Sequence, residues 1–228
     1  MTTVIAPAGR KLQIALDVIT IPEALAALNA TASHVDVVEV GTILCLSAGM
    51  EAVRCLRAAY PEHTVLADVR IAEAGSLIAN LAYDAGADWV SVVSGAAYST
   101  VEAVVHVAKE RGKDVQVELS EGWDWGYVDH AVSCGVSQFI IHRGRDAEAT
   151  GSLGWSDGDL EAIAELYRRG GRVSVTGGLK PADIEAFTAS PAEIFIAGRG
   201  IYGSEHPIDA VQRYRAAVDS LPDLPERE

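Results

Sequence analysis

The sequence predicts a single-domain (β/α)8 TIM barrel, an α/β fold, and three observations support this fold class. Short β-branched, apolar runs recur along the 228-residue chain, and helical patterns separate them. Apolar runs without polar alternation are typical of strands that are buried on both faces, as in parallel sheets. Nearly every run ends in a polar residue able to take part in chemistry, and barrel enzymes carry their active sites at these strand ends. The eight runs are residues 12–16, 35–38, 64–67, 88–93, 115–117, 136–141, 172–175 and 192–197.

The segments between the runs carry the start and stop signals of helices. Thr20 is placed to cap a helix that has Pro22 in its first turn. Gly86, Gly112 and Gly135 follow the ends of later helical patterns, where glycine is favoured. The expected helices are residues 21–30, 48–59, 75–85, 100–111, 125–134, 157–169, 181–189 and 206–221. The division that follows is an N-terminal segment (1–11), the barrel (12–221) and a charged tail (222–228).

Composition excludes several classes of partner. Hydrophobic residues make up 49% of the chain, which is enough for a large core without disulfides. The formal net charge of −14 argues against a nucleic-acid partner, because phosphate contacts need clustered Lys and Arg. The sequence has no secretion-signal pattern and no apolar stretch near the roughly 18 residues of a membrane span. We therefore expect a cytoplasmic protein with no membrane partner, and we interpret Cys45, Cys55 and Cys134 as reduced thiols in packing roles.

Glycine-rich segments follow the seventh and eighth runs. The segments are Thr176-Gly177-Gly178 and Gly198-Arg199-Gly200. Barrels often bind phosphate between these two loops, where glycine lets backbone N–H groups approach the phosphate and an Arg adds a charged donor. The alternative is that these glycines only turn the chain. The pairing of the two loops favours a phosphate site.

Carboxylates end the first three runs. Asp17, Glu39 and Asp68 should converge at the barrel mouth, where repulsion between them would raise their pKa values unless a cation lies among them. Mg²⁺ prefers one or two carboxylates, with substrate and water completing its shell. We expect Glu39 and Asp68 to be the metal ligands and Asp17 to pair with Arg70 or with a substrate hydroxyl. A purely structural ion network is the alternative.

The third run leads into a row of alternating charges. Asp68 and Arg70 should share one face of the strand, because side chains alternate, and Glu73 follows in the loop. Together with His142 and its neighbouring arginines after the sixth run, this row predicts an acid–base site.

Several of these segments resemble the orotidine monophosphate decarboxylase superfamily, which has a ribulose-phosphate-binding barrel. Within it the chain is most similar to the 3-keto-L-gulonate 6-phosphate decarboxylases, with the hexulose-6-phosphate synthases as the nearest relatives. The similarity extends from about Leu12 to Leu221. The segments that carry it are Ala15-Leu16-Asp17, Val38-Glu39-Val40-Gly41-Thr42, Leu66-Ala67-Asp68, His142-Arg143-Gly144-Arg145-Asp146, Val175-Thr176-Gly177-Gly178 and Ile196-Ala197-Gly198-Arg199.

Three positions separate the two groups, and two positions depart from both. Glu118, Arg145 and Thr176 match the decarboxylases, whereas the synthases usually carry Asp, a small or apolar residue, and Ala. Arg70 and Glu73 stand where the family has Lys and Asp. The charges keep their signs but the geometry changes, because Arg is a planar fork and Lys a compact point charge.

The resemblance implies an activity and a role for each candidate residue. The activity is Mg²⁺-dependent decarboxylation of a phosphorylated β-keto sugar acid, 3-keto-L-gulonate 6-phosphate, to L-xylulose 5-phosphate and CO2 through a 1,2-enediolate. A synthase-type aldolase, another sugar-phosphate substrate or lost catalysis are the alternatives. The resemblance also implies a homodimer in which Glu73 reaches the neighbouring site. The implied catalytic residues are Asp68, Arg70, Glu73, His142 and Arg145, the substrate-binding residues are Asp17, Glu118, Thr176, Gly177, Gly178, Gly198 and Arg199, and the metal ligands are Glu39 and Asp68.

Overall fold

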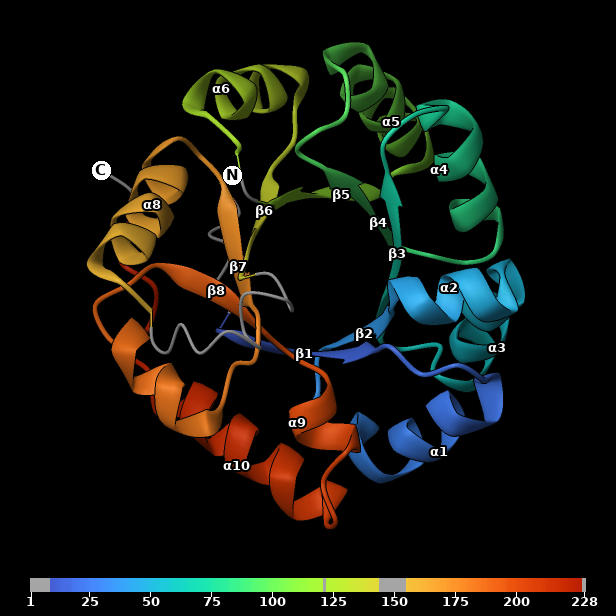
Figure 1. Cartoon of the computed structure of the whole chain (residues 1–228), viewed down its shortest axis with the longest axis vertical. Coiled ribbons are helices and arrows are strands. Elements are labelled where there is room, and N and C mark those ends of the chain that lie inside the picture. Colours follow the sequence, from blue (N-terminus) through green and yellow to red (C-terminus); the bar gives the residue numbers. More distant parts are fainter. Residues whose placement is uncertain (1–8, 121, 144–154, 227–228) are drawn as a thin grey trace, which may run out of the picture.

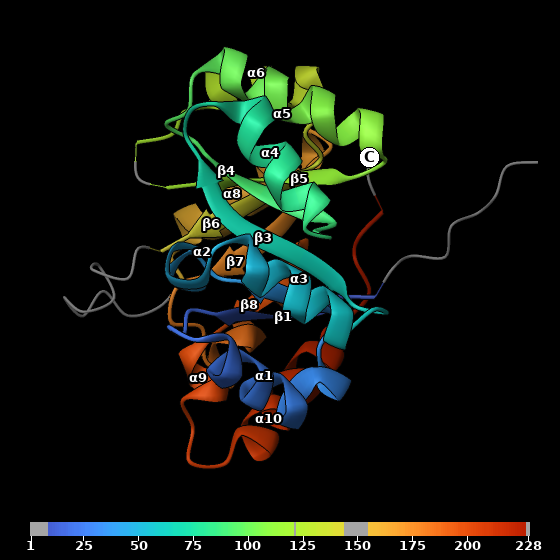
Figure 2. The same cartoon turned by 90° about the vertical axis from the view of Figure 1, so that its right-hand side faces the viewer.

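The predicted barrel is confirmed by a computed structural model, which describes residues 9–120, 122–143 and 155–226. Eight parallel strands close into a barrel in chain order, and the helices surround it (Figure 1). In the perpendicular view the strands lie inside the layer of helices (Figure 2). The strands are β1 (Lys11–Leu16), β2 (Val37–Val40), β3 (Thr64–Ile71), β4 (Trp89–Val93), β5 (Asp114–Leu119), β6 (Gln138–His142), β7 (Arg172–Thr176) and β8 (Ala192–Ala197).

The helices agree with the prediction except in two places. Thr20 caps the first helix, and its side chain and that of Glu23 form a capping box, as the sequence indicates. The helix expected at 48–59 begins only at Met50, after Gly49 with its left-handed φ of 63°, and residues Thr42–Ala48 before it form a separate helix that the sequence does not predict. The segment expected at 181–189 is a 3₁₀ helix. The helices are α1 (Ile21–Thr31), α2 (Thr42–Ala48), α3 (Met50–Ala59), α4 (Gly75–Asp84), α5 (Tyr98–Arg111), α6 (Trp125–Cys134), α8 (Asp157–Arg168), α9 (Arg199–Tyr202) and α10 (Pro207–Asp219), with 3₁₀ segments η1 (Ala32–His34) and η2 (Pro181–Phe187).

The barrel interior is partly polar, although the strands look apolar in sequence. An apolar layer that includes Leu66, Trp89 and Ile140 is separate from the larger core under the helices. The fully buried Gln116 donates from Nε2 to Oε1 of Gln138 at 3.1 Å. Hydrogen bonding of this kind is required of polar groups that are buried away from water.

One irregularity in β3 shapes the barrel mouth. The pairing of β3 with β4 shifts register between Ala67 and Ile71, and Arg70 adopts a left-handed φ of 46°. Ala74, in the loop before α4, is also left-handed. This conformation is uncommon for residues other than glycine, so the surrounding contacts must hold it. Within the described ranges, no helix combines the length and apolar character needed to span a membrane.

Candidate active site

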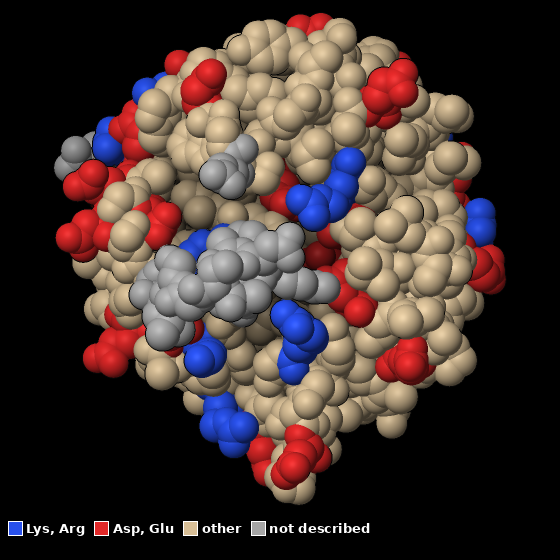
Figure 3. Space-filling view, in the orientation of Figure 1, with Lys and Arg blue, Asp and Glu red and all other residues tan. Residues whose placement is uncertain are grey.

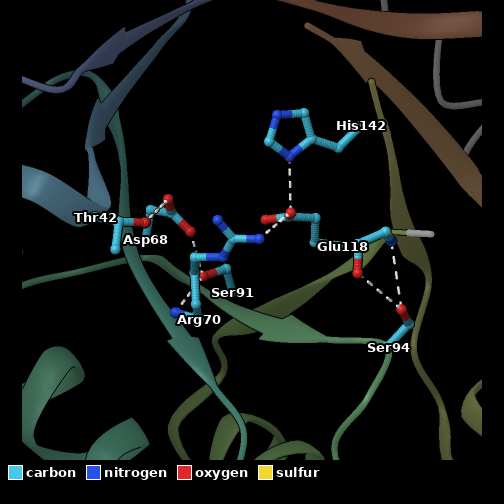
Figure 4. Close-up of polar contacts among 8 residues, drawn as sticks. Thr42, Asp68, Arg70, Ser91, Ser94, Glu118 and His142 are labelled. Carbon is cyan, nitrogen blue, oxygen red and sulfur yellow. Dashed lines mark hydrogen bonds and ion pairs between the residues drawn. The ribbon is translucent and has the colours of Figure 1, made fainter. Parts of the chain in front are cut away.

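Asp68 is fixed by two hydroxyl groups at the C-terminal end of β3 (Figure 4). Thr42 Oγ1 donates to Asp68 Oδ2 at 2.5 Å, and Ser91 Oγ donates to Asp68 Oδ1 at 2.6 Å. The same Ser91 oxygen accepts the backbone N–H of Arg70 at 2.8 Å. Ser91 therefore ties the orientation of Asp68 to the left-handed backbone of Arg70.

Glu118 joins two candidate groups that can carry positive charge. Its Oε1 accepts from Arg70 Nη2 at 2.5 Å and lies 2.7 Å from His142 Nδ1. Glu118 is almost fully buried, whereas Arg70 and His142 are partly exposed. Arg70, His142 and Glu118 thus form one charged unit at the ends of β3, β5 and β6.

The expected pairing of Arg70 with Asp17 is wrong, since Arg70 pairs with Glu118. At this point β3 shifts register and Arg70 adopts a left-handed conformation, and its side chain reaches Glu118 of β5. Asp17 instead accepts the backbone N–H of Ile43 at 3.3 Å. A Cβ on Gly41 would collide with the Asp17 carboxylate, so glycine is required there for this approach. The other expected role of Asp17, holding a substrate hydroxyl, stays a prediction.

The carboxylates of Glu39 and Asp68, the metal ligands that the resemblance implies, are both desolvated by burial. Glu39 lies within β2, is only 8% exposed and accepts a hydrogen bond from Gln13 Nε2 at 2.6 Å. Burial raises the pKa of Glu39 well above its ordinary value, and the charge of Asp68 raises it further. Burial also raises the pKa of Asp68. The sequence predicts raised pKa values from mutual repulsion, but burial is the larger cause for both groups.

The oxygen donors here suit a hard cation such as Mg²⁺. Two buried carboxylates with raised pKa values are an unfavourable arrangement unless a proton or a cation neutralises them. Gln13 Oε1, beside Glu39, has no hydrogen-bond partner within the described part of the chain. Glu39 and Asp68 therefore fit the metal role that the resemblance implies.

The loops after β7 and β8 depend on glycine geometry. Gly177 and Gly178 both have left-handed φ angles, of 109° and 62°. A Cβ on Gly177 would collide with the carbonyl oxygen of Arg143, and a Cβ on Gly198 would lie 2.8 Å from the carbonyl oxygen of Ala15. Arg143 also donates from Nη2 to the Gly177 carbonyl at 3.0 Å. The two loops are thus held close to the ends of β6 and β1.

Figure 3 shows acidic and basic side chains gathered around the hollow at the centre of this face. Thr176 pairs in register with His142, which brings the β7 loop beside the charged unit. Arg199 is exposed and begins α9 directly after Gly198. The site therefore combines a carboxylate region, a charged unit and a glycine-rich region at one end of the barrel.

Two predicted residues are not brought into this site. Glu73 is exposed and forms no hydrogen bond or ion pair with the described residues of its own chain. Arg145 lies outside the described residues. Trp123 and Trp125 pack edge to face at 4.8 Å and line a groove against α8, which favours rim packing over a place in the sugar pocket.

Sequence reasoning missed three residues that contact the carboxylates: Gln13, Thr42 and Ser91. Gln13 and Ser91 each interrupt an otherwise apolar strand, and a polar residue in such a place needs a buried partner. These polar residues within apolar strands could therefore have been predicted to contact a buried polar group. Thr42 carries no comparable signal, because nothing in the sequence predicts the helix α2 that it begins.

Comparison with known proteins identifies the family of this chain. The family model "Orotidine 5'-phosphate decarboxylase / HUMPS family" matches residues 10–214. The chain is 41% identical over 210 residues to the 3-keto-L-gulonate-6-phosphate decarboxylase UlaD of Salmonella paratyphi B, covering 92% of this chain and 97% of that protein.

Two solved structures share the whole barrel. KGPDC from Streptococcus mutans, solved as a complex with a ligand, has a TM-score of 0.90 and 32% identity, covering 93% of this chain and 98% of that one. The 3-hexulose-6-phosphate synthase of Salmonella typhimurium has a TM-score of 0.87 and 29% identity, covering 93% and 100%. With a matched family model, near-complete coverage and polar side chains converging at the barrel mouth, the chain is an enzyme of the orotidine 5'-phosphate decarboxylase / HUMPS family.

Proposed function

We propose that this enzyme decarboxylates 3-keto-L-gulonate 6-phosphate to L-xylulose 5-phosphate and CO2, through a 1,2-enediolate and with Mg²⁺ as cofactor. The observation that carries the proposal is the charged unit of Arg70, Glu118 and His142 beside Asp68. The identity to UlaD, which is named for this substrate, supports the choice of sugar acid. UlaD and the S. typhimurium synthase are both named for a sugar 6-phosphate, which supports a phosphorylated ligand.

Loss of CO2 breaks a carbon–carbon bond and leaves its electron pair on the substrate, so the site must stabilise negative charge. The guanidinium of Arg70, held by Glu118, supplies fixed positive charge there. Glu39 and Asp68 would hold Mg²⁺, which when bound supplies Lewis-acid stabilisation of the same charge. Because Arg stays protonated in proteins, Arg70 acts as an electrostatic group and does not deliver a proton.

The proton that completes the reaction goes to carbon. His142 lies at the end of β6, and its Nδ1 contact with Glu118 fixes the ring. We assign to it the positioning of the water that reprotonates the enediolate, together with Arg145 as the resemblance implies. We assign the phosphate to Gly177, Gly178, Gly198 and Arg199, and the sugar hydroxyls to Asp17, Glu118 and Thr176.

A panel of phosphorylated keto acids, assayed for CO2 release with Mg²⁺ and with EDTA, tests this function. We expect fastest turnover with 3-keto-L-gulonate 6-phosphate and loss of turnover in EDTA that Mg²⁺ restores. The panel should include aldol condensation of formaldehyde with ribulose 5-phosphate, because the similarity to the S. typhimurium synthase favours that activity as a second candidate. CO2 release slower than condensation would overturn the proposal.

A homodimer is part of the proposal. Helices α2 and α4 expose large apolar side chains, with Leu46 at 79% and Leu77, four residues after Glu73, at 64%. Exposed large apolar side chains favour association with a partner surface. A second copy packed there would bring Glu73 of one chain near the site of the other, which would account for its lack of partners within its own described chain.

Mixing two inactive variants tests this arrangement. Asp68→Asn and Glu73→Ala chains, each inactive alone, are combined under conditions that exchange subunits. If Glu73 acts across the interface, each mixed dimer contains one site with both native residues, and CO2 release returns. If Glu73 acts within its own chain, no site is intact in the mixture. A monomer by sedimentation would contradict the proposal directly.

A further inference from the structure

Three side chains of different metal-ligand types meet between α5 and α6, apart from the candidate active site. Cys134 Sγ lies 3.3 Å from His130 Nε2, and His130 Nε2 lies 3.2 Å from Glu102 Oε1. All three atoms lie within 4.8 Å of one another. His130 and Cys134 are one helical turn apart on α6, and Glu102 comes from α5, its neighbour in Figure 1.

The His130 ring is held in this orientation by Tyr98. The two rings stack at 4.0 Å between centroids with an interplanar angle of 12°. Nε2 therefore faces both the thiol and the carboxylate, although a ring nitrogen carries at most one proton. Nε2–H can donate to only one of these neighbours at a time, whereas a cation at the centre would attract all three atoms.

We propose that Glu102, His130 and Cys134 bind a divalent ion of the Zn²⁺ class, with water as a fourth ligand. Zinc takes sulfur at about 2.3 Å and nitrogen or oxygen at about 2.0–2.2 Å in a tetrahedral shell. Ligand atoms of such a shell lie roughly 3.3–3.6 Å apart, and the two short separations here, 3.3 and 3.2 Å, are close to that range. The sulfur and nitrogen ligands exclude Mg²⁺, which prefers oxygen, so this site differs in metal class from Glu39 and Asp68.

Charge and protons balance in this site. The Cys134 thiol loses its proton to solvent as the metal binds, and Glu102 and the resulting thiolate neutralise the two positive charges of the ion. Lys109 Nζ donates to the Cys134 carbonyl oxygen at 2.6 Å, so that carbonyl is already engaged. The bound ion would join α5 to α6 and stabilise the barrel wall between them.

Titration with Co²⁺ tests the site, because a Co²⁺–thiolate bond gives a charge-transfer absorption that oxygen ligands do not. The untagged protein is titrated in saturating Mg²⁺, so that the carboxylates of the candidate active site do not contribute. We expect one equivalent with a thiolate band, displaced by Zn²⁺. Cys134→Ser and His130→Ala should lose the band, and Glu102→Gln should weaken binding by at least the ~10–100-fold that loss of an outer-shell partner costs.

Cys55 provides the matched control. Its Sγ lies 3.6 Å from Glu51 Oε1 on α3, a cysteine and glutamate one turn apart without a histidine contact. Cys55→Ser should keep the band and the rise in Tm that Zn²⁺ gives the native protein, while Cys134→Ser should lose both. Absence of a thiolate band at one equivalent, or loss of the band in Cys55→Ser but not in Cys134→Ser, would overturn the proposal.

Discussion

At the ends of β3 to β6 the candidate active site consists of side chains that bond to one another, whereas at the ends of β7 and β8 it consists of turns that depend on glycine. Glu118 contacts both Arg70 and His142, and Ser91 contacts both Asp68 and the Arg70 backbone. In the other half, the positions of greatest constraint are those where any side chain would collide.

This difference predicts how each half responds to mutation. In the first half a side chain acts through its partners, so single changes should have large effects that do not add. In the second half the absence of a side chain is what matters, so the harmful changes are those that add atoms. Four predictions test this contrast, from the largest expected effect to the smallest.

Asp68→Asn should give the largest loss. The amide has one acceptor oxygen where the carboxylate has two, so it cannot accept from both Thr42 and Ser91 as Asp68 does. Loss of a proposed Mg²⁺ ligand would remove stabilisation of the developing negative charge, so kcat/KM for CO2 release should fall by about 10²–10³-fold. Asp84→Asn, at an exposed ion pair with Arg111, is the control and should keep full activity. Equal activity of the two variants would contradict the assignment of Asp68.

Glu118→Gln and His142→Asn should be strongly coupled. Both changes weaken the same 2.7 Å contact, because one removes the charge of the carboxylate and the other removes the imidazole ring, so the loss in the double variant should be smaller than the sum of the single losses. We expect an interaction of about 1 kcal/mol or more in kcat/KM. Glu118→Gln combined with Arg199→Ala, which lies in the glycine half, should instead add within about 0.5 kcal/mol. Coupling of equal size in both pairs would remove the distinction between the two halves.

The sequence predicts the barrel and the placement of polar residues at strand ends, because burial dictates which runs are apolar. It does not predict the partner of Arg70. The direction of the Arg70 side chain depends on a register shift in β3 and on its left-handed φ. Its partner Glu118 comes from β5 and also contacts His142 of β6. These are properties of the closed barrel, and no local pattern carries them.

The missed helix α2 has a similar explanation. Residues Thr42–Ala48 form one short helix without a side-chain N-cap, and Gly49 separates it from α3. Its stability comes from contacts with β3 and from its two buried residues, Leu44 and Cys45, more than from its own helix signals. Sequence patterns do not predict short helices whose stability depends on tertiary packing.

Gly177→Ala should have a moderate effect that falls on binding. The added Cβ would collide with the Arg143 carbonyl oxygen at a left-handed φ, so the loop must move. We expect KM for the phosphorylated substrate to rise by about tenfold, or ~1.4 kcal/mol, with a smaller change in kcat. Gly158→Ala, where the nearest atom to a Cβ is 3.7 Å away, is the matched control and should leave KM unchanged. A fall in kcat alone would place the glycine loop outside substrate binding.

Glu39→Gln should show the smallest effect in magnitude, on stability, and the effect has an unusual sign. Burial raises the pKa of Glu39, so above the ordinary Glu pKa the folded protein is destabilised relative to an unfolded chain that ionises this group freely. The neutral amide removes that penalty and can still accept from Gln13. Above the raised pKa, and with EDTA present, the variant should therefore have a Tm higher by at least about 2–4 °C, the shift that 1 kcal/mol gives in a domain of this size. CO2 release should nevertheless fall.

The pH dependence of the Tm difference between Glu39→Gln and the native protein tests whether the raised pKa of Glu39 causes it. As pH falls through the raised folded-state pKa, Glu39 becomes protonated in the folded protein and its destabilising effect shrinks. Below the ordinary Glu value of about 4.3 both folded and unfolded states are protonated, and the Tm difference between variant and native protein should vanish.

Glu193 is the control, because it is equally buried but paired with Arg172, so Glu193→Gln should lower Tm at neutral pH. Mg²⁺ should raise the Tm of the native protein more than that of Glu39→Gln, since only the native protein has the second carboxylate. If Glu39→Gln instead lowers the Tm at neutral pH, Glu39 stabilises the fold. The argument that this carboxylate destabilises the protein and is present for metal binding would then be contradicted.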